Sequence, residues 1–198
     1  MDIIRNIIEN SIDVKKGLLM DHLFISLLDE ACSLCVNAYQ NNRKILIAGN
    51  GGSAADAQHI AGELVSRLNF DRAALSAIAL STDTSILTAI GNDYGFDKVF
   101  SRQIEANGNE NDVFIAISTS GDSPNILESL KVCKATNIKT IGLTGQKGGI
   151  MEKYCDVCLK VPSTITPRIQ ESHIMIGHIL CDIIEKKLFK NDELASRY

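Results

Sequence analysis

Short, mostly apolar runs alternate along the chain with longer segments in which apolar residues recur every three or four positions. Five runs too short to be helices lie at 45–48, 75–80, 113–117, 138–143 and 156–161. Such runs are typical of parallel strands that are covered on both faces, and the spacing between them is helical. The pattern therefore predicts an α/β fold with a five-stranded parallel sheet.

Two helices are expected before the first strand. Apolar residues at helical spacing fill residues 2–41, with a break near 17–21. We interpret 1–41 as an N-terminal helical arm and 42–198 as an α/β core that ends in a helix, together a single domain. The apolar surface of the arm favours packing against a partner subunit. The alternative is that the arm covers one face of its own sheet.

Further helices are expected between the strands and at the end of the chain. They occupy an alanine-rich segment that ends near 67, then 82–90, 97–106 and 124–135, a short segment after 149, and 168–188. Pro124 suits the first turn of its helix. Residues 91–95 are expected to form a turn.

A glycine-rich loop, Gly49–Ser53, joins the first strand to a helix. Glycine permits positive φ and a close approach of the backbone to a ligand. Ser53 is placed to cap the helix that follows. A strand, a glycine loop and a helix N-terminus direct backbone N–H groups at an anion, most often a phosphate. We therefore predict a phosphate site at this loop.

A second loop with anion-binding groups follows the third strand. Hydroxyl groups at Ser118, Thr119, Ser120 and Ser123 precede Pro124 and a helix. Turns and caps also use such residues, but the buried strand before them and the helix after them favour phosphate binding. In doubly wound folds, ligands bind beyond the carboxyl ends of the strands, where both loops lie.

His59 and Glu63 lie four residues apart, on one face of a predicted helix. Alone, such a pair is more often a surface pair than a metal site. The C-terminal helix adds Gln170 and His178, which are about 80° apart around its axis. His173 lies about 140° from His178 and is a poorer candidate. The two pairs form a donor set that suits zinc and retains a carboxylate and an imidazole for proton transfer.

The composition excludes several classes of protein. Hydrophobic residues make up 45% of the chain and charged residues 22%, as in ordinary globular domains. The net charge of −4 gives no electrostatic basis for binding nucleic acid, and no apolar run approaches the ~18 residues of a membrane span. Acidic residues among the first ten positions do not fit a secretion signal. We expect a cytoplasmic protein that binds neither nucleic acid nor a membrane.

The six cysteines include two C-x-x-C pairs, Cys32/Cys35 and Cys155/Cys158. Four thiolates at this spacing would suit a structural zinc ion. However, Cys32 and Cys35 fall on one apolar face of a predicted helix, and Cys155 and Cys158 flank a predicted strand, which places them on opposite faces. We therefore interpret the cysteines as ordinary core residues.

Five motifs, taken in order, carry a family resemblance: GNGGS, GNDYGF, STSG, LTG-x-x-GG and RIQE-x-H-x-x-x-x-H. With them the chain resembles, over essentially its whole length, the phosphoheptose isomerases, members of the sugar isomerase (SIS) domain superfamily. The resemblance implies a flavodoxin-like doubly wound sheet. It also implies a homotetramer with active sites at the subunit interfaces.

The same resemblance implies an activity and a set of site residues. These enzymes convert sedoheptulose 7-phosphate to D-glycero-D-manno-heptose 7-phosphate, the first step towards nucleotide-activated heptoses for lipopolysaccharide, capsule or surface glycans. One zinc ion per subunit would be held by His59, Glu63, Gln170 and His178. Substrate would be contacted by Asn50, Gly51, Gly52, Ser53, Glu63, Asn92, Asp93, Ser118, Thr119, Ser120, Ser123 and Gln170.

Conversion of a ketose to an aldose agrees with these residues. A base takes a proton from C1 to give a cis-enediol, and an acid returns a proton to C2. Glu63 would be the catalytic base and His178 its partner, although the sequence leaves open which group moves which proton.

Two residues depart from the family pattern. Pro167 stands where members often have an acidic residue, which puts the fine specificity for the sugar in doubt, and Gly62 stands where many have a glutamate. The competing hypothesis is a non-catalytic SIS protein that binds a replication initiator. Such a protein lacks counterparts of Glu63 and His178, which this chain has. A sugar-phosphate sensor of a transcription factor would need a DNA-binding module, for which the sequence shows no sign.

Overall fold

The structure is a computed structural model that describes residues 2–189, and it confirms the five-stranded parallel sheet. The strands follow the order β2 (Ala77–Ala79), β1 (Ile45–Gly49), β3 (Val113–Ile117), β4 (Lys139–Thr144) and β5 (Val157–Lys160). Every neighbouring pair is parallel. This is the strand order of flavodoxin-like folds, in which a ligand crevice lies at the carboxyl ends of β1 and β3, where the order reverses.

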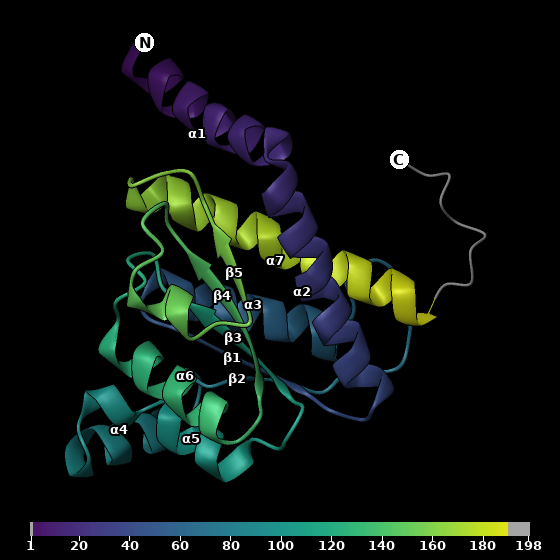
Figure 1. Cartoon of the computed structure of the whole chain (residues 1–198), viewed down its shortest axis with the longest axis vertical. Helices are drawn as coiled ribbons and strands as arrows, with labels where there is room; N and C mark the ends of the chain where they lie inside the picture. The colour runs from purple at the N-terminus through teal and green to yellow at the C-terminus, as the bar shows by residue number, and fades with distance from the viewer. Residues whose placement is uncertain (1, 190–198) are drawn as a thin grey trace.

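Helices cover both faces of the sheet (Figure 1). The first layer consists of α2 (His22–Gln40), α3 (Gly52–Val65) and α7 (Thr166–Phe189), and the second of α4 (Thr84–Asp93), α5 (Ser101–Asn107) and α6 (Pro124–Ala135). Alternate residues of each strand enter different cores: Ile45 and Ile47 face the first layer, and Leu46 and Ala48 face the second. Burial on both faces explains why the strands are apolar throughout. No described helix is long and apolar enough to cross a membrane.

The N-terminal arm consists of α1 (Asp2–Met20) and α2, separated by Asp21 alone. The Asp21 carboxylate caps α2 by accepting hydrogen bonds from the N–H groups of Leu23 and Phe24 at 3.0 and 3.1 Å. The break therefore falls at the end of the predicted interval, and Gly17 lies inside α1.

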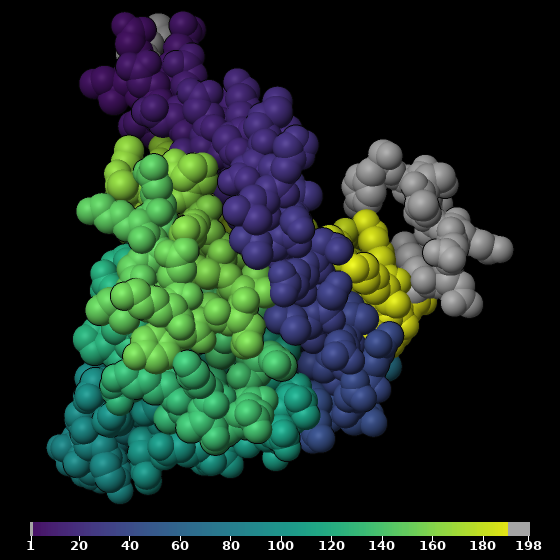
Figure 2. Space-filling view, viewed as in Figure 1, coloured from purple at the N-terminus to yellow at the C-terminus, as the bar shows by residue number. Residues whose placement is uncertain are grey.

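The two helices of the arm have different surroundings. α2 packs into the core over the sheet, whereas α1 projects beyond the body of the molecule (Figure 2). Exposed isoleucines run along α1: Ile3, Ile4, Ile7, Ile8 and Ile12. The alternative that the whole arm covers its own sheet is therefore wrong for α1.

Three boundaries differ from the sequence-based prediction. β2 is confined to Ala77–Ala79 instead of 75–80, because it is an edge strand that pairs with β1 alone. α4 continues into the predicted turn at 91–95 and ends at Asp93, since the first residue there with positive φ is Gly95, at 95°, and not Gly91. The helix predicted at 97–106 divides into a 3-10 turn, Phe96–Lys98, and α5.

A buried ion pair fastens the C-terminal end of α3 to α7. Nε of Arg72 donates to Oε1 of Glu185 at 2.9 Å, and the two side chains are only 2% and 1% exposed. Arg72 also donates to the carbonyl oxygens of Glu63 and Leu64, and Glu185 accepts from two backbone N–H groups that follow α3. These hydrogen bonds offset the cost of removing both charges from water.

We expect Glu185→Gln to be strongly destabilising, because it leaves the Arg72 guanidinium buried without a counter-charge. The free energy of unfolding, measured by urea denaturation, should fall by about 3–5 kcal/mol. Glu105→Gln is the matched control: Glu105 pairs with Arg102 at the surface, and its loss should cost less than about 1 kcal/mol. Equal effects of the two substitutions would contradict the role given to the buried pair.

Candidate active site

Three donor side chains meet between α3 and α7. His59 and Glu63 lie one turn apart on α3, and His178 lies opposite them on α7. The two imidazole Nε2 atoms are 2.8 Å apart, and Nε2 of His59 is 3.3 Å from Oε1 of Glu63. All three ligand atoms lie within 4.8 Å of one another. The structure therefore brings together three of the four predicted metal ligands.

This cluster of His59, Glu63 and His178 suits a zinc ion. Imidazole nitrogens and carboxylate oxygens are common zinc ligands, and the ligand atoms of a tetrahedral zinc lie about 3–3.5 Å apart. Within residues 2–189, it is the one group of three His, Cys, Asp or Glu side chains close enough to share a metal ion. The side chains of His59 and Glu63 are 47% and 21% exposed, so both an ion and a substrate can reach them.

Gln170 and His173 lie elsewhere on α7. The amide of Gln170 packs against Gly52, where an added Cβ would lie 2.6 Å from its Nε2. Gln170 is thus next to the glycine loop (49–53), and its role as a fourth ligand stays a prediction. His173 is fully buried, and burial lowers its pKa to about 4, so that it is neutral near pH 7. This placement agrees with leaving His173 out of the ligand set.

The glycine loop begins α3 without a side-chain cap. Gly51, with a φ of 56°, is the N-cap residue, and Ser53 lies buried inside the first turn. The predicted cap at Ser53 is therefore wrong, because the helix starts from a backbone conformation that favours glycine. Gly51 offers no side-chain cap, and the N–H groups of Ser53 and Ala54 instead donate to the carbonyl oxygens of Asn50 and Gly51, each at 3.0 Å.

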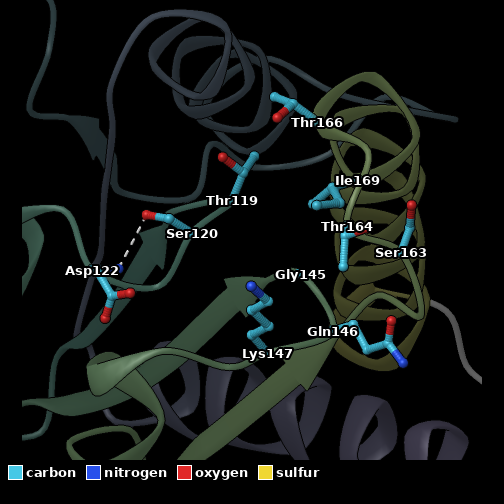
Figure 3. Close-up of a pocket in the computed structure, with 10 residues that line it drawn as sticks. All are labelled: Thr119, Ser120, Asp122, Gly145, Gln146, Lys147, Ser163, Thr164, Thr166 and Ile169. Atoms are coloured by element: carbon cyan, nitrogen blue, oxygen red, sulfur yellow. Dashed lines mark hydrogen bonds between the residues drawn. The ribbon is translucent and has the colours of Figure 1, made fainter.

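The hydroxyl loop (118–123) supplies the second half of the predicted phosphate site. Oγ of Ser118 lies 2.8 Å from Oγ of Ser123 and 3.4 Å from Oγ of Ser120, so three of the four hydroxyls are grouped. Thr119 is not part of this group and, together with Ser120, lines a cavity of about 290 Å³ between this loop, the loop after β4 and the start of α7 (Figure 3). Lys147 reaches into this cavity from the loop after β4.

Asn125, which sequence reasoning missed, joins the two loops. Its amide exchanges a pair of hydrogen bonds with the amide of Asn50, at 2.8 and 2.9 Å. Both residues line a second cavity, of about 310 Å³, together with Phe96. This cavity lies at the crevice where the strand order reverses. The predicted substrate residues Asn92 and Asp93 end α4 just before Phe96 and are exposed, but they do not line the cavity.

Asp56 is a second carboxylate near the cluster that the sequence did not single out. It lies one turn before His59 on α3, and its Oδ2 is buried without a hydrogen-bond partner among the described residues. Burial raises the pKa of Asp56, and the charge of His59 lowers it. Asp56 and His59 are three residues apart on a helix and therefore lie on the same face, and this spacing could have identified Asp56 from the sequence.

Known proteins share this sequence and fold. The SIS domain family model matches residues 25–145. A phosphoheptose isomerase from Aneurinibacillus thermoaerophilus is 57% identical over 190 residues, which cover 96% of each chain. The chain belongs to the phosphoheptose isomerase family.

Other phosphoheptose isomerases agree with this assignment. Phosphoheptose isomerase 2 from Campylobacter jejuni is 59% identical over 180 residues, or 91% of this chain and 90% of that protein. The solved structure of a phosphoheptose isomerase from Francisella tularensis, 38% identical, matches with a TM-score of 0.90 over 93% of this chain and 97% of that one. The predicted family and its flavodoxin-like fold are confirmed, and these relatives do not favour the non-catalytic alternative.

Gly177 sets the spacing between α3 and α7 beside His178. A Cβ at position 177 would lie 2.7 Å from Cδ1 of Ile60, which is itself fully buried. We expect Gly177→Ala to push the helices apart and so weaken Zn²⁺ binding by about 10–100-fold, measured by titration calorimetry. Overpacking should also lower the free energy of unfolding by about 1–3 kcal/mol.

Gly62→Ala is the matched control for this prediction. Gly62 lies on α3 next to Glu63, and a Cβ there would meet nothing within 4 Å. The variant should bind Zn²⁺ like the wild type and gain up to about 1 kcal/mol from helix propensity. Wild-type Zn²⁺ affinity in Gly177→Ala would show that the helix spacing does not control the cluster.

Proposed function

We propose that this chain isomerises sedoheptulose 7-phosphate to D-glycero-D-manno-heptose 7-phosphate. The observation that carries the proposal is the convergence of His59, Glu63 and His178 between two helices that start beside the predicted phosphate loops. A base and an acid next to a phosphate site are what isomerisation of a sugar phosphate requires. The relatives named above are called phosphoheptose isomerases. The product would supply, in the cytoplasm, nucleotide-activated heptoses for lipopolysaccharide, capsule or surface glycans.

The distance from the glycine loop to the cluster supports a substrate of this length. His59 lies seven positions after Gly52 on α3, which corresponds to about 10 Å along the helix axis. An open-chain heptulose 7-phosphate carries its phosphate at the end opposite to C1. A single molecule can therefore place its phosphate at the loops and its C1 and C2 atoms at the cluster.

Different parts of the site bind the phosphate and transfer the protons. The phosphate binds at the start of α3 and to the grouped hydroxyls of Ser118, Ser120 and Ser123. Binding at that end orients the C1 and C2 atoms of the sugar at the cluster. Glu63 takes the proton from C1 to form the cis-enediol, and His178 is the acid partner that completes proton return to C2. One zinc ion per subunit, held by His59, Glu63, His178 and Gln170, would supply positive charge that stabilises the enediol oxygens.

We expect Glu63→Gln to abolish most of the activity, because an amide cannot accept the C1 proton. Turnover of sedoheptulose 7-phosphate by zinc-loaded protein, followed by NMR of substrate and product, should fall about 10²–10⁴-fold. The surface variant Glu105→Gln should keep the wild-type rate.

Two measurements separate loss of the base from loss of metal or fold. Zinc per chain is determined by elemental mass spectrometry, and the thermal midpoint is determined by circular dichroism, for the wild type and for Glu63→Gln. The proposal requires that activity be lost while fold and assembly persist. Wild-type protein that holds zinc but leaves sedoheptulose 7-phosphate unchanged would refute the proposed function, and a protein partner would then be sought.

We also propose that the chain forms a homotetramer with active sites at the subunit interfaces. The exposed isoleucines of α1 support this, because an apolar helix face of this kind normally packs against another surface. Arg168 of α7 donates to the carbonyl oxygen of Ile7 at 2.7 Å, two residues before Gln170. A subunit that docks on α1 would therefore lie close to the candidate active site.

Charges introduced into the apolar face of α1 should disrupt this assembly. The double variant Ile4→Asp/Ile8→Asp is expected to give dimers or monomers by size-exclusion chromatography with light scattering, since docking would bury the new carboxylates. Asn6→Asp, on the polar face of the same helix, adds a charge without blocking the apolar face and should leave the tetramer intact. A tetramer that survives the double substitution would exclude α1 from the interface.

A further inference from the structure

The second C-x-x-C pair has a geometry that its spacing does not predict. Cys155 and Cys158 were expected on opposite faces of β5, but both sulfurs lie over Gly142 of β4. A Cβ added to Gly142 would lie 2.7 Å from Sγ of Cys155 and 3.5 Å from Sγ of Cys158. Cys155 precedes β5, and a bend at Asp156 lets it turn towards the face that Cys158 occupies. Because Gly142 has no side chain, the two sulfurs occupy the space above its Cα atom.

The two thiols interact, and neither is fully buried. A side-chain hydrogen bond between them lowers the pKa of Cys158 and raises the pKa of Cys155, so the first proton leaves Cys158. The thiolate is the reactive form of cysteine. Both residues are half-buried, and Cys155 lines a cavity of about 310 Å³ that also contains Lys139 and Lys153.

The other C-x-x-C pair lacks these features and provides a control within the chain. Cys32 and Cys35 have the same spacing, but they lie inside α2 and are fully buried. Burial raises the pKa of Cys32 to about 11 and also raises the pKa of Cys35. Cys32 and Cys35 lie in the core on one face of the sheet, whereas Cys155 packs against the core on the other face, which excludes a zinc site made from all four thiolates.

We propose that Cys155 and Cys158 form a redox-active dithiol that hydrogen peroxide oxidises to an intrachain disulfide. The Cys158 thiolate attacks one peroxide oxygen, the S–O bond forms as the O–O bond breaks, and the departing hydroxide takes up a proton to become water. The Cys155 sulfur then attacks the Cys158 sulfenic acid, the S–S bond replaces the S–O bond, and a second water leaves with the thiol proton. Two thiols are oxidised and one peroxide is reduced to two waters.

Backbone contacts link this pair to the hydroxyl loop. The 3-10 turn η2 (Ile150–Lys153) ends two residues before Cys155. At its other end, the N–H group of Met151 donates to the carbonyl oxygen of Gly121 at 3.0 Å, and the N–H group of Ile150 donates to Oδ1 of Asp122 at 2.7 Å. Forming an S–S bond draws Cys155 closer to Cys158, so oxidation should shift this turn and the loop it holds.

The dithiol is tested with folded, reduced wild-type protein treated with hydrogen peroxide. Mass spectrometry of proteolytic peptides should show the loss of two hydrogens from the peptide containing Cys155 and Cys158, while Cys32 and Cys35 stay reduced. In urea, where burial no longer differs, both pairs should oxidise at similar rates. Cys155→Ser should stop the reaction at a sulfenic acid on Cys158 that dimedone traps, and Cys158→Ser should abolish that adduct.

Several results would overturn the proposal. The proposal is wrong if the two pairs oxidise equally in the folded protein, if the disulfide forms between chains, or if no disulfide forms between Cys155 and Cys158. This readout does not depend on turnover, so it stands or falls separately from the proposed function.

The link to the hydroxyl loop rests on the proposed function and has its own readout. The disulfide form should show a KM for sedoheptulose 7-phosphate raised at least about twofold, and the variant Cys155→Ser/Cys158→Ser should not respond to peroxide. An unchanged KM in fully disulfide-bonded protein would overturn the link.

Discussion

The packing of α3 against α7 is the constraint on which the candidate active site depends. Contacts advance in step along both helices: Gly52 lies against Gln170, Ile60 against Gly177, and the backbone after α3 against Glu185. The two helices therefore run side by side in the same direction. His59 and His178 face each other at the middle level of this series. A slip of one residue would turn a donor by about 100° around its helix and separate the cluster.

Glycine and buried charge set this register in different ways. Gly52 and Gly177 allow close approach at two levels, but a contact without side chains does not by itself prevent sliding. The ion pair of Arg72 and Glu185 does, because a shift would leave a charge in the core with no partner. A hydrophobic pair at this position could give equal stability. It would not specify which turn of α3 meets which turn of α7.

The sequence predicted the features that depend on local pattern. The strands are apolar runs because both faces of the sheet are covered. The spacing of four residues places His59 and Glu63 on one face of α3. The contribution of Arg72 could not be predicted, since Glu185 is 113 positions away and each residue alone resembles a surface charge. Ser53 was assigned as a cap from residue type, whereas the φ of Gly51 decides where α3 begins. Asn125, in the first turn of α6, could not be predicted, because its partner Asn50 lies 75 positions away in the glycine loop.

The donor cluster lies outside the core that positions it. His59 and His178 are exposed, while their neighbours Ile60 and Gly177 are buried. Side chains so exposed contribute little to the free energy of folding, because they remain in contact with water in both states. The packed core of α3 and α7 can therefore keep its structure while these side chains exchange protons or bind an ion. It also follows that loss of either imidazole would leave the fold intact. On this fold, a few side chains at the surface of α3 and α7 would distinguish an isomerase from a non-catalytic protein. The register of the two helices is set by the buried contacts between them.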